Sequence, residues 1–232
     1  MKNNNRFIVF AAISLALVLS GCATPTKMAF EKDTEVWTEK SKPVYLMTAT
    51  IKNNYHTAYQ PRLRVVHVEK TGAKGAADKL NFTMDDKAKN LETDSAATGS
   101  NYLLRLQMDP GSYDVIGMTC TSASFPIIGF FMLPVHEHLD VNGSGIYYLG
   151  HINATVRERK GDEFKAGPSI PLIDQAVAGA SGGTWDVEVT DGFATDEALF
   201  RSQFPALKDA NIQKQILPAF DRAEAQKWWE AH

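Results

Sequence analysis

The sequence predicts a mostly β protein: an antiparallel β-sandwich followed by two short C-terminal helices. Three observations support this prediction. Apolar and polar residues alternate with a period of two along many short segments, as in strands that bury one face. Residues that favour turns separate these segments. Helical spacing of apolar residues is almost absent before residue 190, and many short strands without helices are typical of a sandwich.

The alternation is clearest at 102–109, 146–157 and 185–190. Further strands are expected at 44–52, 62–70, 80–84, 112–121, 127–133 and 135–141. We expect a turn at Asp109-Pro110-Gly111-Ser112, because Pro110 fixes its own φ and Gly111 accepts the positive φ of type II geometry. Asn142-Gly143 is typical of a hairpin turn between two of these strands.

Two stretches interrupt the strands. Residues 85–100 are polar, and residues 161–183 are rich in Gly, Ala, Ser and Pro, which predicts two long loops. Each loop is either functional or a floppy insertion, and the apolar residues of the second could fold back onto the sandwich: Ile170, Leu172, Ile173 and Val177. We therefore divide the chain into a signal peptide at 1–21, a tether at 22–35, the sandwich domain at 36–192 and a helical extension at 193–232.

The helical extension contains two expected helices. Thr195 is followed by two carboxylates, so it is expected to cap the first helix, and Pro205 to end it. The second helix is expected to begin near Pro218, since proline is favoured at the first helical position. Trp228 and Trp229 in this helix form a large apolar area, which either docks onto the sandwich, fills a groove of a partner or lies at a membrane interface.

The N-terminal segment has the parts of a secretory signal peptide. Lys2 and Arg6 precede an apolar run at 7–19. As a helix this run would span roughly 20 Å, which is well short of a hydrocarbon core of about 30 Å. The run is therefore expected to be removed rather than to remain as a transmembrane span.

The end of this segment, Leu19-Ser20-Gly21-Cys22, resembles the lipobox of bacterial lipoproteins. The resemblance implies cleavage before Cys22, a thioether-linked diacylglycerol on Cys22 and a further acyl group such as palmitate on the new amino group. Ala23 follows the cysteine, which resembles the class sorted to the outer membrane. The expected localisation is thus the bacterial outer membrane, with lipid anchoring and a body that faces the periplasm.

Charge and cysteine content limit the possible functions. Removing Lys2 and Arg6 from the 24 basic residues leaves 22 against 27 acidic ones, a formal charge of −5. No stripe of basic residues is present, so a nucleic-acid partner is not expected. With Cys22 acylated, Cys120 cannot form an intramolecular disulfide; it is expected in the core, or else as a reactive or intermolecularly bridged thiol.

Two further motifs, Pro110-Gly111-Ser112-Tyr113 and Tyr147-Tyr148, resemble the core of uncharacterised bacterial envelope lipoproteins. In that family the core is a transthyretin-like or Ig-like β-sandwich. The resemblance covers about residues 100–160. It implies a sandwich fold and an envelope location, and it brings no known activity and no catalytic residues.

Histidines offer one possible ligand site. His136, His138 and Asp140 alternate along one expected strand, and His151 lies on the polar face of the next. Histidines two apart on a strand could share a metal with a ligand from a neighbouring strand, but the same residues also form an ordinary solvated face. The alternative function is therefore a periplasmic protein that binds a metal or a small ligand.

The motifs that could indicate an enzyme lack the context that catalysis requires. Ser181 stands in Gly179-Ala180-Ser181-Gly182-Gly183, which has the letters of a nucleophile elbow, but the expected strand follows it instead of preceding it. Four nearby carboxylates form no spaced acid–base pair: Asp174, Asp186, Glu188 and Asp191. We therefore expect no catalytic residues and no cofactor. The predicted function is a non-catalytic binding or envelope-assembly module, with the membrane as partner through the N-terminal acyl chains and an envelope protein as the second candidate partner.

Overall fold

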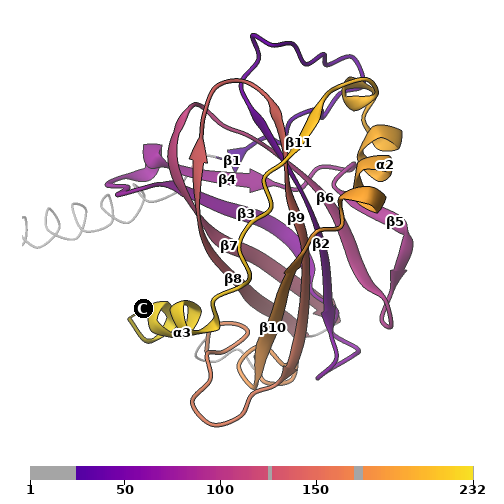
Figure 1. The fold of residues 1–232 in the computed structure, drawn as a ribbon. Helices are drawn as coiled ribbons and strands as arrows, with labels where there is room; N and C mark the ends of the chain where they lie inside the picture. Colours follow the sequence, from indigo (N-terminus) through magenta and orange to yellow (C-terminus); the bar gives the residue numbers. More distant parts are fainter. Residues whose placement is uncertain (1–24, 125–126, 170–174, 232) are drawn as a thin grey trace, which may run out of the picture.

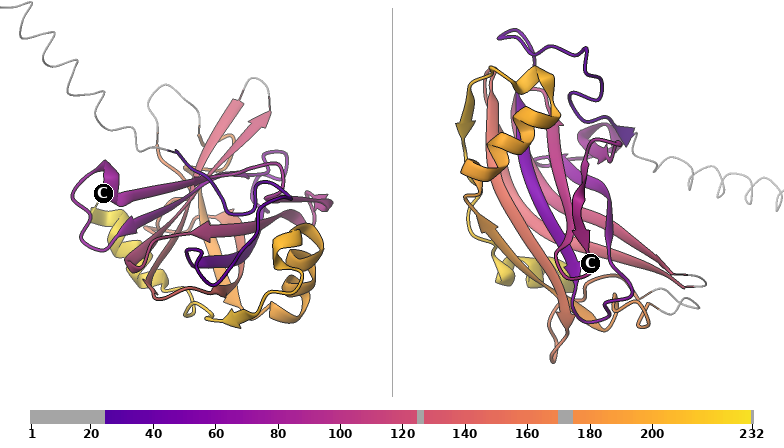
Figure 2. Two further views of the ribbon diagram at one scale, coloured as in Figure 1. Left: turned by 90° about the horizontal axis from the view of Figure 1, so that it is seen from above. Right: turned by 90° about the vertical axis from the view of Figure 1, so that its right-hand side faces the viewer.

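The computed structural model describes residues 25–124, 127–169 and 175–231 (Figure 1). The fold is mostly β with two α-helices near the C-terminus, as the sequence predicts. Within these residues the strands form a five-stranded and a six-stranded sheet (Figure 2). The five-stranded sheet has the order β1 (Pro25–Thr26), β4 (Lys79–Thr83), β3 (Arg62–Lys70), β7 (Gly111–Ser124), β8 (Ile127–Val141). The six-stranded sheet has the order β10 (Gly183–Thr190), β9 (Ile146–Glu158), β2 (Val44–Asn53), β6 (Gly99–Gln107), β5 (Lys89–Ser95), and β11 (Ile212–Lys214) also pairs with β9.

The sheets are mixed, so the expectation of a purely antiparallel arrangement is wrong. The pairs β1–β4, β2–β9 and β9–β11 are parallel. The hairpin expected at Asn142-Gly143 is also absent, because β8 and β9 belong to different sheets and this connection crosses between them. Alternation with a period of two reports which face of a strand is buried, but not its partner or direction.

The expected strands are present, with boundaries that differ by a few residues. The segments expected at 127–133 and 135–141 are one strand, β8, in which Pro134 lies inside the strand. Proline is tolerated there because β8 is at the edge of its sheet, where a missing backbone donor breaks no interior ladder. The β7–β8 register shifts next to Gly117, and His136 has a φ of 53° at this bulge.

The polar stretch at 85–100 is not a plain loop. It contains β5, which pairs with β6 at the edge of the six-stranded sheet. Just before β5, the carbonyl of the buried Ala88 accepts a hydrogen bond from Leu103 N at 2.6 Å. An edge strand is paired on one side only, so it can be polar and still belong to the sheet.

One hydrophobic cluster takes side chains from both sheets. Met47 and Leu104 come from the six-stranded sheet, and Val66 and Met118 from the five-stranded one. The sheets also touch through aromatic side chains. The rings of Phe131 (β8) and Trp185 (β10) are 6.1 Å apart, and Leu63 N donates to Tyr102 Oη at 3.0 Å.

A second cluster covers the outer face of the six-stranded sheet. Val44 and Leu46 of β2 point into it, together with Phe200 of α2 (Phe193–Gln203) and Phe204, which follows the helix directly. This sheet is therefore buried on both faces near β2. The double burial explains why β2 begins with a continuous apolar run rather than with alternation.

The first residues of the described chain pack against the rest of the protein. β1 begins at Pro25, and Met28, Ala29 and Phe30 are buried, so part of the segment expected as a tether packs against the body. Residues 1–24, including the signal peptide and Cys22, lie outside the described residues, as do Ile170, Leu172 and Ile173.

The helices begin at other residues than expected. α2 begins at Phe193 with Gly192 at its N-cap, two residues before Thr195, while Pro205 opens a 3₁₀ turn after it (Pro205–Leu207). α3 (Arg222–Ala231) begins four residues after Pro218, because Asp221 accepts hydrogen bonds from the first-turn N–H groups. A short 3₁₀ turn, Ala76–Asp78, precedes β4. Among the described residues, no helix is long and apolar enough to span a bilayer.

Candidate functional site

The three histidines considered as metal ligands are not brought together. His136 and His138 are on β8 of the five-stranded sheet, whereas His151 is on β9 of the six-stranded sheet. His136 stacks on Trp228, with ring centres 4.9 Å apart. In the described part of the chain, no group of three or more His, Cys, Asp and Glu residues could hold a metal ion. The placement of these histidines therefore does not support a single metal site shared by all three, which the sequence offered as an alternative.

His138 belongs to an ordinary exposed cluster. Its Nδ1 lies 2.9 Å from Asp114 Oδ1 and its Nε2 lies 3.3 Å from Asp140 Oδ1. The hydrogen bond to Asp114 raises the pKa of His138. The cluster faces solvent, as in the alternative reading of a solvated strand face.

The other sequence candidates also have structural roles. Ser181 lies in a series of turns and is followed by β10, so the strand–turn–helix context of a nucleophile elbow is absent at this residue. Cys120 is fully buried in the core, as expected, and burial raises the pKa of its thiol. Asp186 is exposed, and its two carboxylate oxygens share the Nε–H of Arg157, each at 2.9 Å.

Sequence reasoning missed a partly buried polar cluster under α2, which we call the His151 network: Thr48, Thr50, Asn101, Tyr148, His151, Asn153 and Asp196. Asp196 comes from the first turn of α2, and the other members come from β2, β6 and β9. Its Oδ2 accepts hydrogen bonds from Thr48 Oγ1 and, at 2.5 Å, from Tyr148 Oη. These bonds join the helix to the outer face of the six-stranded sheet.

Two threonine hydroxyls hold the ring of His151. Thr48 Oγ1 lies 2.8 Å from His151 Nδ1 and donates to Asp196. Thr50 Oγ1 lies 3.1 Å from His151 Nε2 and donates to Asn101 Oδ1 at 2.6 Å. Both ring nitrogens of His151 are therefore engaged within the network.

Asp196 is the carboxylate of this network. Its Oδ2 lies 3.6 Å from His151 Nδ1, and the side chain is only 8 % exposed. Although burial disfavours the ionised form, the hydrogen bonds from His151, Thr48 and Tyr148 lower the pKa of Asp196. Burial and the bond to this carboxylate raise the pKa of Tyr148. A cavity of about 430 Å³ lies beside the network.

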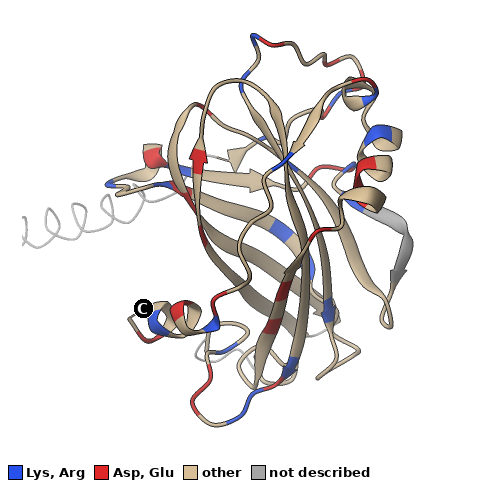
Figure 3. Ribbon diagram, in the orientation of Figure 1, with Lys and Arg blue, Asp and Glu red and all other residues tan. Residues whose placement is uncertain are grey.

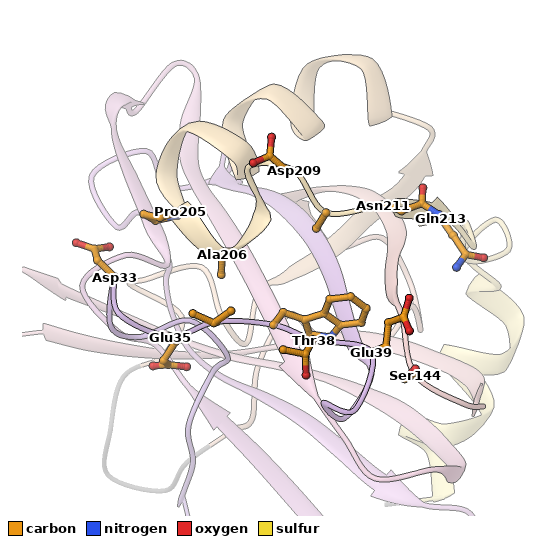
Figure 4. Close-up of a pocket in the computed structure, with 14 residues that line it drawn as sticks. Asp33, Glu35, Thr38, Glu39, Ser144, Pro205, Ala206, Asp209, Asn211 and Gln213 are labelled. Carbon is orange, nitrogen blue, oxygen red and sulfur yellow. The ribbon is translucent and has the colours of Figure 1, made fainter.

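A larger, open cavity of about 880 Å³ lies where residues 33–39 face residues 205–213; we call it the end cavity (Figure 4). Its carboxylates are Asp33, Glu35, Glu39 and Asp209. Asp33 pairs with Lys87, and Glu35 accepts from backbone N–H groups, whereas Glu39 and Asp209 make no ion pair with another described residue.

Apolar groups complete the end cavity. Val36 is 76 % exposed. The indole Nε1 of Trp37 is buried and has no hydrogen-bond partner among the residues that the structure describes. The end cavity thus combines negative charge with exposed apolar surface.

A third cavity, of about 440 Å³, lies between α3, β8 and residues 164–168; we call it the α3 cavity. Its lining is mostly apolar and includes Phe130, Met132, Trp228 and Trp229. The tandem tryptophans therefore dock against the body, which is the first of the three alternatives that the sequence left open. Basic and acidic residues are interspersed on α3 and on the connection between β9 and β10 (Figure 3).

Comparisons with models of known protein families, with curated proteins and with solved structures found no match to this chain.

Proposed function

We propose that this protein is a lipid-anchored, periplasm-facing lipoprotein of the bacterial outer membrane that acts as a non-catalytic binding or envelope-assembly module. The proposed body is a β-sandwich of the transthyretin-like or Ig-like kind. The core cluster shared by both sheets supports this architecture.

The position of the first strand supports a short anchor. Only Ala23 and Thr24 separate the proposed lipid attachment at Cys22 from β1, which begins at Pro25. At about 3.3–3.6 Å per residue, the distance from Cys22 to Pro25 is at most roughly 10 Å. The acyl chains would hold the body close to the membrane surface, and such a module would meet partners in or near the outer membrane.

The end cavity is the observation that carries the binding role. Glu39 and Asp209 are carboxylates without an ion pair among the described residues, and they lie beside exposed Val36 and the buried indole N–H of Trp37. A basic segment with apolar neighbours complements both features. We infer that the partner is an envelope protein that presents such a segment.

Site-specific photo-cross-linking in cells tests this role. A photoreactive amino acid replaces Val36 in the lipidated full chain; the matched control carries it at Ile128, the other strongly exposed large apolar residue among those described. We expect one envelope protein to be cross-linked at position 36 and not at 128. Glu39→Lys/Asp209→Lys should abolish this product, while Glu158→Lys/Glu188→Lys, with the same charge change at exposed sites on β9 and β10, should leave it intact.

Three outcomes would overturn the binding role: no product at position 36, equal products at both positions, or a product that is insensitive to the charge reversal at Glu39 and Asp209.

The lipid anchor has its own test. Cys22→Ser should abolish palmitate labelling and move the protein to the aqueous phase of a detergent phase separation, and continued partition with detergent would contradict lipid anchoring.

A further inference from the structure

We propose that the α3 cavity binds a single acyl chain that ends in a carboxylate, that is, a fatty acid. This site is separate from the end cavity, so the inference does not depend on the proposed envelope partner. It rests on the shape, rigidity and charge of the cavity.

The cavity has the size and lining of a small-molecule site. Its volume of about 440 Å³ lies within the usual range of roughly 300–1,000 Å³ for such sites. Phe130, Met132 and Pro134 of β8 form one wall, and Trp228 and Trp229 of α3 contribute to the opposite one. Such walls suit a flexible alkyl chain, because each methylene that moves from water into an apolar cavity strengthens binding.

Hydrogen bonds fix the wall formed by α3. Arg222 Nη1 donates to Trp185 O at 2.6 Å, and its Nη2 donates to Glu163 Oε1 at 2.9 Å. Arg157 also donates to this carboxylate and lowers the pKa of Glu163 to about 2, so the acceptor stays ionised. Gln226 accepts from Phe164 N at 2.6 Å. The helix is thus attached at several points before any ligand arrives, which reduces the ordering cost of binding.

Two cations lie next to the apolar walls. Lys165 lines the cavity, with its Nζ 5.9 Å from the centre of the Trp229 ring, and the guanidinium of Arg159 lies 5.8 Å from the same ring. Neither cation forms an ion pair with a carboxylate among the described residues: Lys165 donates to Ser169 Oγ, and Arg159 donates to the Glu163 carbonyl. An anionic head group on a chain in the cavity would complement these charges.

Titration of the purified full chain with dodecanoate and with dodecanol tests the proposal. The chain carries Cys22→Ser and is delipidated first, so that its own acyl chains cannot compete. We expect saturable one-to-one binding by calorimetry, with the acid bound at least about threefold more tightly than the alcohol. A brominated fatty acid should quench tryptophan fluorescence, because Trp228 and Trp229 line the cavity.

Two variants locate the site, each checked for an unchanged thermal midpoint. Met132→Glu places a charge in the cavity wall and should reduce dodecanoate binding at least about tenfold. The matched control Ile128→Glu introduces the same side chain in place of an exposed apolar residue of the same strand and should bind like the parent. Lys165→Gln should keep binding of the alcohol but lose the preference for the acid, a change that a merely structural lysine would not produce.

Absence of saturable binding, equal affinity for acid and alcohol, or unchanged binding in Met132→Glu would each overturn the proposal. Tryptophan fluorescence could instead change with protein concentration and not with the brominated fatty acid. That result would indicate a second copy of the chain as the occupant of the cavity and would also overturn the proposal.

Discussion

Replacing Asp196 with Asn tests whether the His151 network holds α2 on the six-stranded sheet. The carboxylate accepts hydrogen bonds from Thr48 and Tyr148 and lies 3.6 Å from His151. Asparagine keeps the shape but removes the charge. A hydrogen bond to a charged group contributes about 1.5–3 kcal/mol and a neutral one about 0.5–1.5 kcal/mol. Weakening both bonds and removing the charge of this nearly buried carboxylate should lower the free energy of unfolding by about 2–4 kcal/mol.

Urea unfolding at pH 7, followed by circular dichroism, measures this loss. With a denaturant slope of about 2 kcal/mol per molar, the midpoint should fall by roughly 1–2 M. The matched control is Asp186→Asn, because this carboxylate also accepts a hydrogen bond from a side chain, Arg157 Nε, but is exposed. The control should change stability by less than about 1 kcal/mol. If Asp196→Asn costs no more than Asp186→Asn, the network does not hold the helix.

The same carboxylate sets an acid limit on stability. Because the folded state lowers the pKa of Asp196, the unfolded state binds the proton more readily. The stabilisation is therefore present above the unfolded pKa of about 3.9 and is lost as the pH falls through the lower folded pKa. Asp196→Asn should remove this part of the acid dependence. An unchanged difference between parent and variant from pH 5 to pH 2 would contradict the pKa assignment.

Three further variants or measurements test other parts of the fold. Asp85→Asn should cost about 3–5 kcal/mol in urea unfolding, because it leaves the fully buried guanidinium of Arg105 without its counterion; a loss below 1 kcal/mol would show that this ion pair is not needed. In a Cys22→Ser chain, Cys120 should react with a thiol reagent at least about 100-fold more slowly in buffer than in urea, and equal rates would mean that the thiol is accessible. Asp221→Ala removes the N-cap of α3 and should cost about 0.5–2 kcal/mol, with a shift in thermal midpoint as the readout and no shift as the contrary result.

The sequence predicted most of the longer strands well because they carry a clear apolar pattern, but it did not predict the polar edge strand β5. The segment expected at 62–70 is β3 without any change in its bounds. What alternation could not supply was the partner of each strand. The turn residues Asn142-Gly143 look the same in a hairpin and in a connection that crosses between sheets, so only tertiary packing distinguishes the two.

The candidate site shows the same limit. Thr48 and Thr50 are two residues apart on β2, as His151 and Asn153 are on β9, so the sequence places each pair on one strand face. Their meeting depends on the parallel β2–β9 register, in which Thr48 is opposite His151. In the sequence, Asp196 is a carboxylate favoured at a helix start. This role gives no reason to connect it with a strand about 150 residues earlier. The sequence shows polar residues two apart on strands and an acid at a helix start. It does not show the strand register that brings these residues together.

The helical extension is joined to both sheets, and this affects how the tail can be studied. α2 covers the outer face of the six-stranded sheet, β11 pairs with β9, and α3 lies against β8 of the five-stranded sheet. Arg222 of α3 also donates to the backbone of Trp185, whose side chain is completely buried in the shared core. Deleting the tail would therefore disturb the core together with the α3 cavity, and a resulting loss of function would not identify its cause. Single substitutions in the cavity wall, such as Met132→Glu, leave the Arg222 hydrogen bonds in place and can separate ligand binding from stability.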